Sequence, residues 1–300
     1  MTNEEVLIKL QGLDLRTNPY TEAKDLIRLL FNRFAVMSFT LHKGKKVTRA
    51  RPNEDGERFK KVNELSFKPQ KFNTTYQRAS TPTTTMFYAG CLPDTNRDNE
   101  LSTARIIGLA EACPLLREAS LDGEKTMTFG LWEVTRDIPL IALCYFEDFI
   151  QKSIHTKELN TVYKSNLIQL SEEDQQNSLI ITDYFAKEFA KENITDHHDY
   201  LLSAVFTEVA MENGFAGVYY PSVRVDGKGF NVAINPKYTH NNLRLIAVME
   251  SKLYKLGKNS HLDDEAFTKI NPGQKNFTLN QISLKHRLGK EQVYNFLTKE

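Results

Sequence analysis

The N-terminal part of the chain carries apolar residues at helical spacing. Six of them follow the period of an amphipathic helix: Ala23, Leu26, Ile27, Leu30, Phe31 and Phe34. Thr21 is placed to cap this helix, and Thr2 with Glu5 predicts a capping box at the start of a shorter helix before it. The chain therefore opens with two predicted helices.

Helical patterns return in the middle of the chain. "STARIIGLAEACP" at 102–114 predicts a helix that Ser102 caps and Pro114 ends. The other predicted helices lie near 145–153, 158–169, 174–192 and 198–213. "HLDDE" at 261–265 predicts the start of one more.

Alternating and short apolar runs predict strands between these helices. "VTRAR" at 47–51 alternates so that Arg49 and Arg51 share one face. "KTMTFGLWEV" at 125–134 predicts a strand with one buried face. Shorter strands are predicted for "TMFYAG", "GVYYPS", "FNVAINP" and "LRLIAVME". Because helices and strands mix without a regular βαβ rhythm, we expect an α+β fold with a largely antiparallel or mixed sheet.

Composition narrows the class of protein. The net charge is +1, with 40% hydrophobic and 26% charged residues, so no global attraction to nucleic acid or to an anionic membrane is expected. No run approaches the length of a membrane span, and Cys91, Cys113 and Cys144 lack CxxC spacing. We expect a cytoplasmic protein with neither a disulfide framework nor a zinc site.

Four segments, taken in order, resemble the RES-domain family. They are "TRAR" at 48–51, "MFYAG" at 86–90, "TARIIGLAEACP" at 103–114 and "ENGFAGVYYPSVRVDGKGFNVAI" at 212–234. The resemblance covers about residues 46–250 and implies a RES domain there. The stretches 1–45 and 251–300 are then expected to be helical extensions at the N- and C-termini.

The resemblance implies a fold similar to that of ADP-ribosyltransferases, with a split mixed or antiparallel sheet and flanking helices. It implies NAD+ as substrate and a toxin that an Xre-type antitoxin neutralises. Family members hydrolyse or phosphorolyse NAD+, or ADP-ribosylate a protein target, so the acceptor stays open. A homo-oligomer is also open, and no membrane partner is expected.

Matching the segments residue by residue gives the candidate site. Arg49 matches the family arginine, Tyr88 the strand tyrosine, Glu111 the glutamate and Ser222 the serine. Two alternatives are open: Arg51 in place of Arg49, and Glu100 in place of Glu111.

The chemistry of NAD+ cleavage suits these residue types. A carboxylate such as Glu111 can stabilise an oxocarbenium-like transition state, and the cationic nicotinamide needs no general acid to leave. Arg49, with Arg51 or Arg78, can bind the pyrophosphate. Tyr88 can stack on the ligand, and Ser222 can position it.

Other features carry weaker predictions. Asn231, with Gly227 and Gly229, can shape the floor of the cleft, although a hairpin turn explains these residues equally well. "DHHD" at 196–199 offers ligand-type side chains, but adjacent histidines cannot share one helix face. We therefore read Asp196 as a helix cap and expect no metal.

Two readings of other functional classes compete with the enzyme. "ISLKHRLGKEQVYNFL" at 282–297 faintly resembles a helix–turn–helix with Gly289 at the turn, which would make the protein DNA-associated, although a terminal amphipathic helix is favoured. The other reading is a non-catalytic RES-like scaffold.

Overall fold

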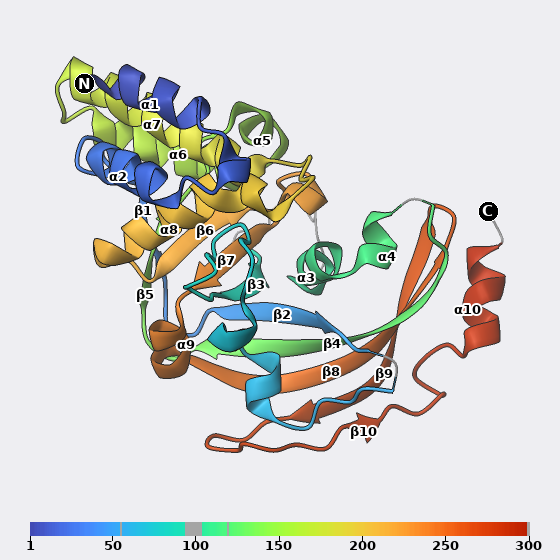
Figure 1. Ribbon diagram of the computed structural model, residues 1–300. Helices are drawn as coiled ribbons and strands as arrows, with labels where there is room; N and C mark the ends of the chain where they lie inside the picture. Colours follow the sequence, from blue (N-terminus) through green and yellow to red (C-terminus); the bar gives the residue numbers. More distant parts are fainter. Residues whose placement is uncertain (55, 94–103, 119, 299–300) are drawn as a thin grey trace.

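The computed structural model describes residues 1–54, 56–93, 104–118 and 120–298. Within them, one mixed sheet has the order β1-β5-β6-β7-β3-β2-β4-β8-β9-β10 (Figure 1). All neighbours pair antiparallel except β5 and β6, which are parallel. The strands are β1 (Ser38–Leu41), β2 (Lys46–Pro52), β3 (Phe87–Cys91), β4 (Gly123–Val134), β5 (Ile138–Ala142), β6 (Gly217–Pro221), β7 (Phe230–Ile234), β8 (Leu243–Leu256), β9 (Asn259–Lys269) and β10 (Asn280–Gln281).

β2 and β3 form the shortest ladder in this sheet. The two strands pair only at Thr48 and Gly90, whereas β2 pairs with β4 along its whole length. This β2–β3 junction divides the sheet into a first half-sheet (β1, β5, β6, β7, β3) and a second half-sheet (β2, β4, β8, β9, β10). The predicted α+β class with a mixed sheet is confirmed.

Helix α3 (Ala104–Ala112) lies over the β2–β3 junction and contacts both strands (Figure 1). Two glycines allow this close approach. A Cβ on Gly90 would lie 2.8 Å from the carbonyl oxygen of Ala104, and a Cβ on Gly108 would lie 3.0 Å from the Cβ of Ala50. The predicted helix 102–114 is thus present from Ala104, and Ser102 lies outside the described residues.

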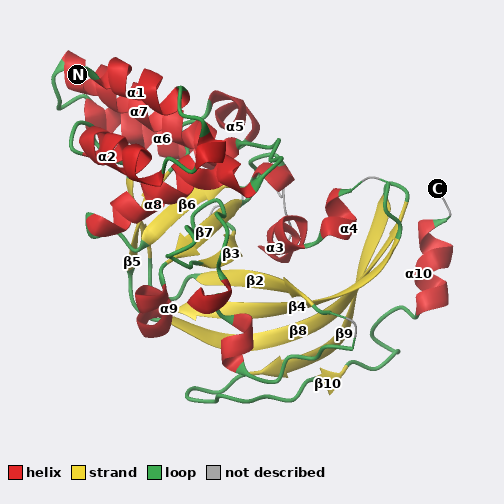
Figure 2. Ribbon diagram, in the orientation of Figure 1, coloured by secondary structure: helices red, strands yellow, loops and turns green. Residues whose placement is uncertain are grey.

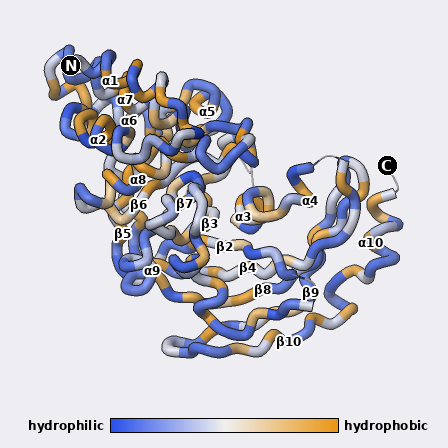
Figure 3. Tube along the Cα trace, in the orientation of Figure 1, coloured by the Kyte–Doolittle hydropathy of each residue, from blue (hydrophilic) through white to orange (hydrophobic). Residues whose placement is uncertain are grey.

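Most other helices gather at one end of the molecule (Figure 2). Their largest core cluster includes a long buried stretch of α8, and Figure 3 shows hydrophobic residues concentrated there. The helices of this group are α1 (Asn3–Gln11), α2 (Tyr20–Phe31), α5 (Glu147–Lys152), α6 (Ile154–Leu167), α7 (Glu172–Ala190) and α8 (Leu201–Glu212). Across the described residues, no helix has both the length and the apolar content that a membrane span requires.

Of three predicted helix ends, the structure confirms one and corrects two. Thr2 and Glu5 form the predicted capping box of α1. Thr21 does not cap α2, because the helix already begins at Tyr20, after Pro19. Pro114 does not simply end a helix either: it occupies the first turn of α4 (Pro114–Arg117), where its missing N–H leaves no hydrogen bond unmade.

The polar stretch 52–85 is ordered by short elements. It contains two 3-10 helices, η2 (Val62–Leu65) and η3 (Gln70–Phe72), and two isolated bridges near Tyr88 in the sequence, Gln77–Ser80 and Thr81–Thr84. Three more 3-10 turns lie elsewhere: η1 (Leu15–Thr17), η4 (His197–Tyr200) and η5 (Val223–Val225). The loop is therefore fixed in place next to the β2–β3 junction.

The segment 251–300 corrects the prediction of a helical extension. β8 continues to Leu256, a turn with Gly257 at φ 59° follows, and residues 261–265 lie in β9. The turn residues suit the primed hairpin turns that join antiparallel strands. Of the described residues in this segment, only α10 (Lys290–Leu297) is α-helical.

The helix–turn–helix reading of the C-terminus is also wrong. Residues 282–289 are not helical, and Gly289 is the N-cap of α10 instead of a turn between two helices. Val293 and Leu297 of α10 pack against Tyr254 of β8. The remaining helix, α9 (Pro236–Asn242), connects β7 to β8.

Candidate functional site

A cleft of about 430 Å³ lies at the β2–β3 junction beneath α3. β2, β3, α3, α4 and β7 all contribute to its walls, together with the loop before β3. The described residues that line it include one carboxylate, Glu111, and five arginines: Arg49, Arg51, Arg78, Arg117 and Arg224. The cleft is therefore strongly cationic, although the chain as a whole is almost neutral.

Glu111 is held in a fixed orientation by two buried donors. The Ser222 hydroxyl and the Asn231 side-chain amide each donate to Oε1 of Glu111 at 2.7 Å. Ser222 is fully buried and Asn231 is 5% exposed, so neither donor has water as an alternative partner. Within the described part of the chain, no hydrogen bond reaches Oε2, which leaves that oxygen available to a ligand.

The structure thus brings together three of the residues proposed from the sequence. Glu111 comes from the last turn of α3, Ser222 directly follows β6 as the N-cap of η5, and Asn231 comes from β7. The pairing register of β6 with β7 and of β7 with β3 sets this arrangement. Glu100, the alternative to Glu111, lies outside the described residues.

Arg49 lies in the cleft with part of its guanidinium unused. Its NH1 donates to the Tyr88 carbonyl at 3.0 Å across the β2–β3 junction, and its guanidinium lies 5.6 Å from the ring centre of Phe87. Its Nε has no hydrogen-bond partner in the part of the chain that the structure describes. Burial, and then the charge of Arg51, lower the pKa of Arg49 to about 10. An anionic ligand would offset both effects.

Arg51 is tied to the loop that precedes β3. Its NH1 donates to the Glu64 carbonyl at 2.7 Å, and the guanidinium lies 4.3 Å from the ring centre of Phe59. Its NH2 also approaches the Glu57 carboxylate at 3.7 Å. Both arginines line the cleft, so the choice of Arg49 over Arg51 as the principal ligand stays a prediction.

The hydroxyl of Tyr88 is hydrogen-bonded to the loop before β3 and is not available to a ligand in the cleft. The hydroxyl accepts from the Ala79 backbone N–H at 3.0 Å and lies 2.7 Å from the Ser80 hydroxyl. Burial raises the pKa of Tyr88 to about 12, so the phenol stays protonated at neutral pH. What remains for a ligand is the ring, which lines the cleft.

Arg78 has a structural task in the cleft wall. NH1 and NH2 donate to the carbonyls of Phe189 and Lys191 at the C-terminus of α7, at 2.5 and 2.9 Å. Its guanidinium also lies 5.1 Å from the ring centre of Tyr200. Arg78 therefore adds charge to the cleft while two of its nitrogens are occupied.

Sequence reasoning missed Arg117 and Arg224. Both side chains are exposed at the cleft, and neither has a hydrogen-bond or ion-pair partner among the residues that the structure describes. Arg117 ends α4, and Arg224 lies in η5 two residues after Ser222. Proximity to Ser222 was the only signal in the sequence that could have found Arg224.

The "DHHD" segment differs from expectation in one respect. Asp196 caps η4 as predicted, but the rings of His197 and His198 lie 4.0 Å apart instead of diverging, because a 3-10 turn holds them side by side. One ligand atom from each of Asp196, His197 and His198 fits within 4.8 Å. Asp196 also pairs with Arg16 at 2.7 Å. The absence of a metal stays a prediction.

Comparisons with known proteins identify one family. The family model of the RES domain matches residues 164–255. This stretch contains Ser222 and Asn231, and it ends before the last residue of β8. No curated protein matches the chain. The match over this stretch supports the resemblance to RES domains that the sequence predicted, and with it an NAD-related, toxin-like role in general terms.

Proposed function

We propose that this protein is an NAD+-consuming toxin that cleaves the nicotinamide–ribose bond. The observation that carries the proposal is Glu111, held by Ser222 and Asn231 in a cleft lined by arginines. The RES-domain match supports the same class of substrate. A volume of about 430 Å³ lies within the usual range of small-molecule sites.

The carboxylate is suited to the electronic demand of this reaction. Departure of nicotinamide leaves positive charge on the ribose, and a fixed carboxylate stabilises that charge without reorganising. Ser222 and Asn231 hold Oε1 of Glu111, so Oε2 can accept from a ribose hydroxyl or face the developing cation. Nicotinamide leaves as a neutral group from a cationic pyridinium, so the reaction requires no general acid.

The arginines are suited to the pyrophosphate. Guanidinium groups bind phosphate oxygens through paired N–H donors, and a buried, incompletely paired guanidinium gains most from an anion. Arg49 fits this description through its unpartnered Nε, and Arg117 and Arg224 extend the cationic surface. The ring of Tyr88 offers a face for stacking on the ribose or nicotinamide.

The acceptor of the ADP-ribosyl group is proposed to be water or inorganic phosphate. Transfer to a protein side chain on the same scaffold is the alternative, because all three acceptors attack the same cation. We further propose that an Xre-type antitoxin neutralises the protein by closing the cleft. The support for that partner is the family resemblance.

The test is nicotinamide release from NAD+ by the purified protein, with and without phosphate. Glu111→Gln should reduce release by at least about a hundredfold, because it removes the charge that stabilises the transition state. The matched control is Glu118→Gln, which changes an exposed glutamate near the cleft and should leave release unchanged. Equal rates for Glu111→Gln and wild type would refute the role of Glu111.

Phosphate dependence then separates the acceptors. Release that requires phosphate indicates phosphorolysis, and release without it indicates hydrolysis. If neither buffer supports release, labelled NAD+ in a cell lysate distinguishes transfer to a protein from an inactive scaffold. Label that appears on protein and is lost in Glu111→Gln would support the alternative.

A further inference from the structure

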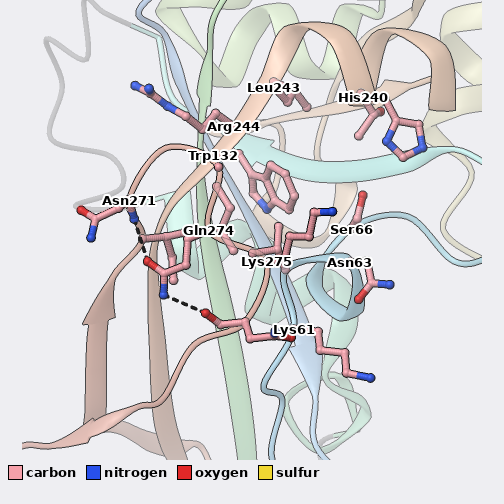
Figure 4. Close-up of a pocket in the computed structure, with 16 residues that line it drawn as sticks. Lys61, Asn63, Ser66, Trp132, His240, Leu243, Arg244, Asn271, Gln274 and Lys275 are labelled. Atoms are coloured by element: carbon pink, nitrogen blue, oxygen red, sulfur yellow. Dashed lines mark hydrogen bonds between the residues drawn. The ribbon is translucent and has the colours of Figure 1, made fainter.

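A second cavity of about 580 Å³ lies away from the cleft (Figure 4). None of the described residues that line it also lines the cleft. Its walls come from η2, the junction of α9 with β8, and the turn at 270–276. We name it the Trp132 pocket, after the indole at its floor.

The Trp132 pocket opens on the sheet face opposite α3. Trp132 belongs to the core cluster that contains Leu65 and Leu245, whereas Phe129 of the same strand packs with Leu109 of α3. Among the described residues, the Trp132 pocket thus shares no lining residue with the cleft, and Lys61, Asn63 and Ser66 separate it from a further cavity that Arg49 and Arg51 also line.

The pocket has an apolar floor and a basic rim. Trp132, Leu243, Leu245 and Ile270 are each less than 8% exposed. The described lining residues include no aspartate or glutamate. Lys61 and Lys275 stand at the rim, are exposed, and form no ion pair within the described residues. Arg244 is also at the rim, but it pairs with Glu133 and points away from Trp132 in Figure 4.

The indole of Trp132 has one unsatisfied polar group beneath the floor of the pocket. Trp132 is 4% exposed, and its Nε1 has no hydrogen-bond partner among the residues that the structure describes. A buried N–H donor left unpaired costs about 1–3 kcal/mol, so such groups are normally satisfied. Gly130 makes room for this donor, since a Cβ there would lie 2.9 Å from Nε1.

We propose that the Trp132 pocket binds a small planar organic anion. The apolar floor, with the indole of Trp132, accommodates the ring system, and Lys61 and Lys275 bind its carboxylate, sulfonate or phosphate group. The volume accommodates a ligand with two or three fused rings.

The chain carries its own reporter for this site. Trp132 is the only tryptophan, so a ligand in the pocket alters the whole tryptophan fluorescence of the protein. The probe is 1-anilinonaphthalene-8-sulfonate, an aromatic sulfonate with a planar naphthalene ring system, and its neutral counterpart is N-phenyl-1-naphthylamine. We expect saturable quenching by the sulfonate at one site per chain and weaker binding of the neutral probe.

Lysine variants locate the bound probe. The double variant Lys61→Gln/Lys275→Gln should weaken sulfonate binding about threefold to tenfold and leave the neutral probe unaffected. The control is Lys237→Gln/Lys285→Gln, which removes two exposed lysines that do not line the pocket. Both pairs lie on the surface, so both proteins should fold.

Three results would overturn the proposal. One is quenching that does not saturate, as expected for loose association with exposed apolar side chains. The second is equal affinity for the sulfonate in the two double variants. The third is weaker binding in Arg224→Gln but not in the lysine variant, which would place the probe in the cleft.

Discussion

Replacing the buried Glu208 with glutamine tests how the loop before β3 is held next to the cleft. Oε1 of Glu208 accepts from the hydroxyls of Thr81 at 2.5 Å and Thr84 at 2.7 Å. Oε2 accepts from the Tyr20 hydroxyl at 2.6 Å and lies 3.3 Å from Lys24 Nζ. One carboxylate thus joins α8, α2 and the loop that leads to Tyr88.

The burial of the Glu208 side chain determines how much Glu208→Gln lowers the free energy of unfolding. Glu208 is 6% exposed, and glutamine keeps its size but loses the charge and turns one acceptor into a donor that faces Lys24. Hydrogen bonds to a charged group contribute about 1.5–3 kcal/mol each, and glutamine retains part of them. We expect Glu208→Gln to lower the free energy of unfolding by about 2–4 kcal/mol.

Glu212 provides a matched control on the same helix. It pairs with Lys24 at 3.0 Å and with Arg28 at 2.9 Å, but its side chain is 38% exposed. Glu212→Gln should therefore cost less than about 1 kcal/mol. Urea unfolding of both variants, followed by tryptophan fluorescence and circular dichroism, measures the difference. Equal costs for the two variants would refute the reasoning.

The same comparison has a pH dependence. Burial raises the pKa of Glu208, but hydrogen bonds from Thr81, Tyr20 and Thr84 and the charge of Lys24 outweigh it, so the pKa lies below 4.5. A lowered pKa means that the stabilisation is present above about pH 4.5 and is lost as the pH falls through the folded-state value. The stability gap between wild type and Glu208→Gln should therefore narrow below pH 4.5.

Three further predictions concern the cleft itself. Gly90→Ala should lower the free energy of unfolding by about 1–3 kcal/mol and reduce nicotinamide release, because the new Cβ would meet the Ala104 carbonyl and displace α3. Thermal unfolding measures the first effect, and unchanged values of both would contradict this packing. Ser222→Ala should lower kcat for nicotinamide release about tenfold to a hundredfold, since Glu111 loses one of its two donors, and a change in KM alone would argue against this positioning role. Arg224→Gln should raise KM for NAD+ a few-fold at constant kcat and weaken its dependence on salt, whereas an unchanged KM would exclude Arg224 from substrate binding.

The helices and central strands were predictable because their apolar positions follow a clear period. The alternation at 47–51 and 125–134 appears in the structure as β2 and β4, and the amphipathic pattern from Ala23 appears as α2. β9 was not predicted from the sequence because it contains a buried charged residue. Asp263 is 3% exposed and pairs with Arg287 at 2.9 Å, so the alternation of that strand is not one of apolar and polar residues.

The candidate site was predictable only in part. Ordered motifs led to Glu111 and Ser222, which the structure places in contact, but the assignment rested on resemblance, since glutamate and serine are common residues. Arg117 had no signal, because a lone arginine at the end of a helix resembles any exposed one. The contact of Thr81 with Glu208 joins residues 127 positions apart, and no local pattern encodes such a distance.

The β2–β3 junction has a consequence for how the protein can be divided and how it folds. Hydrogen bonding across the junction is sparse, yet the chain passes from one half-sheet to the other at every connection from β1 to β5, and again between β7 and β8. The two halves are interlaced by covalent connectivity, so neither can be cut out as an autonomous unit. Residues 164–255 alone would carry β6 without its partner β5, β7 without its partner β3, and β8 without β4. Strands that pair across long stretches of sequence can form only after long loops have closed, which slows folding. Folding therefore requires the complete chain.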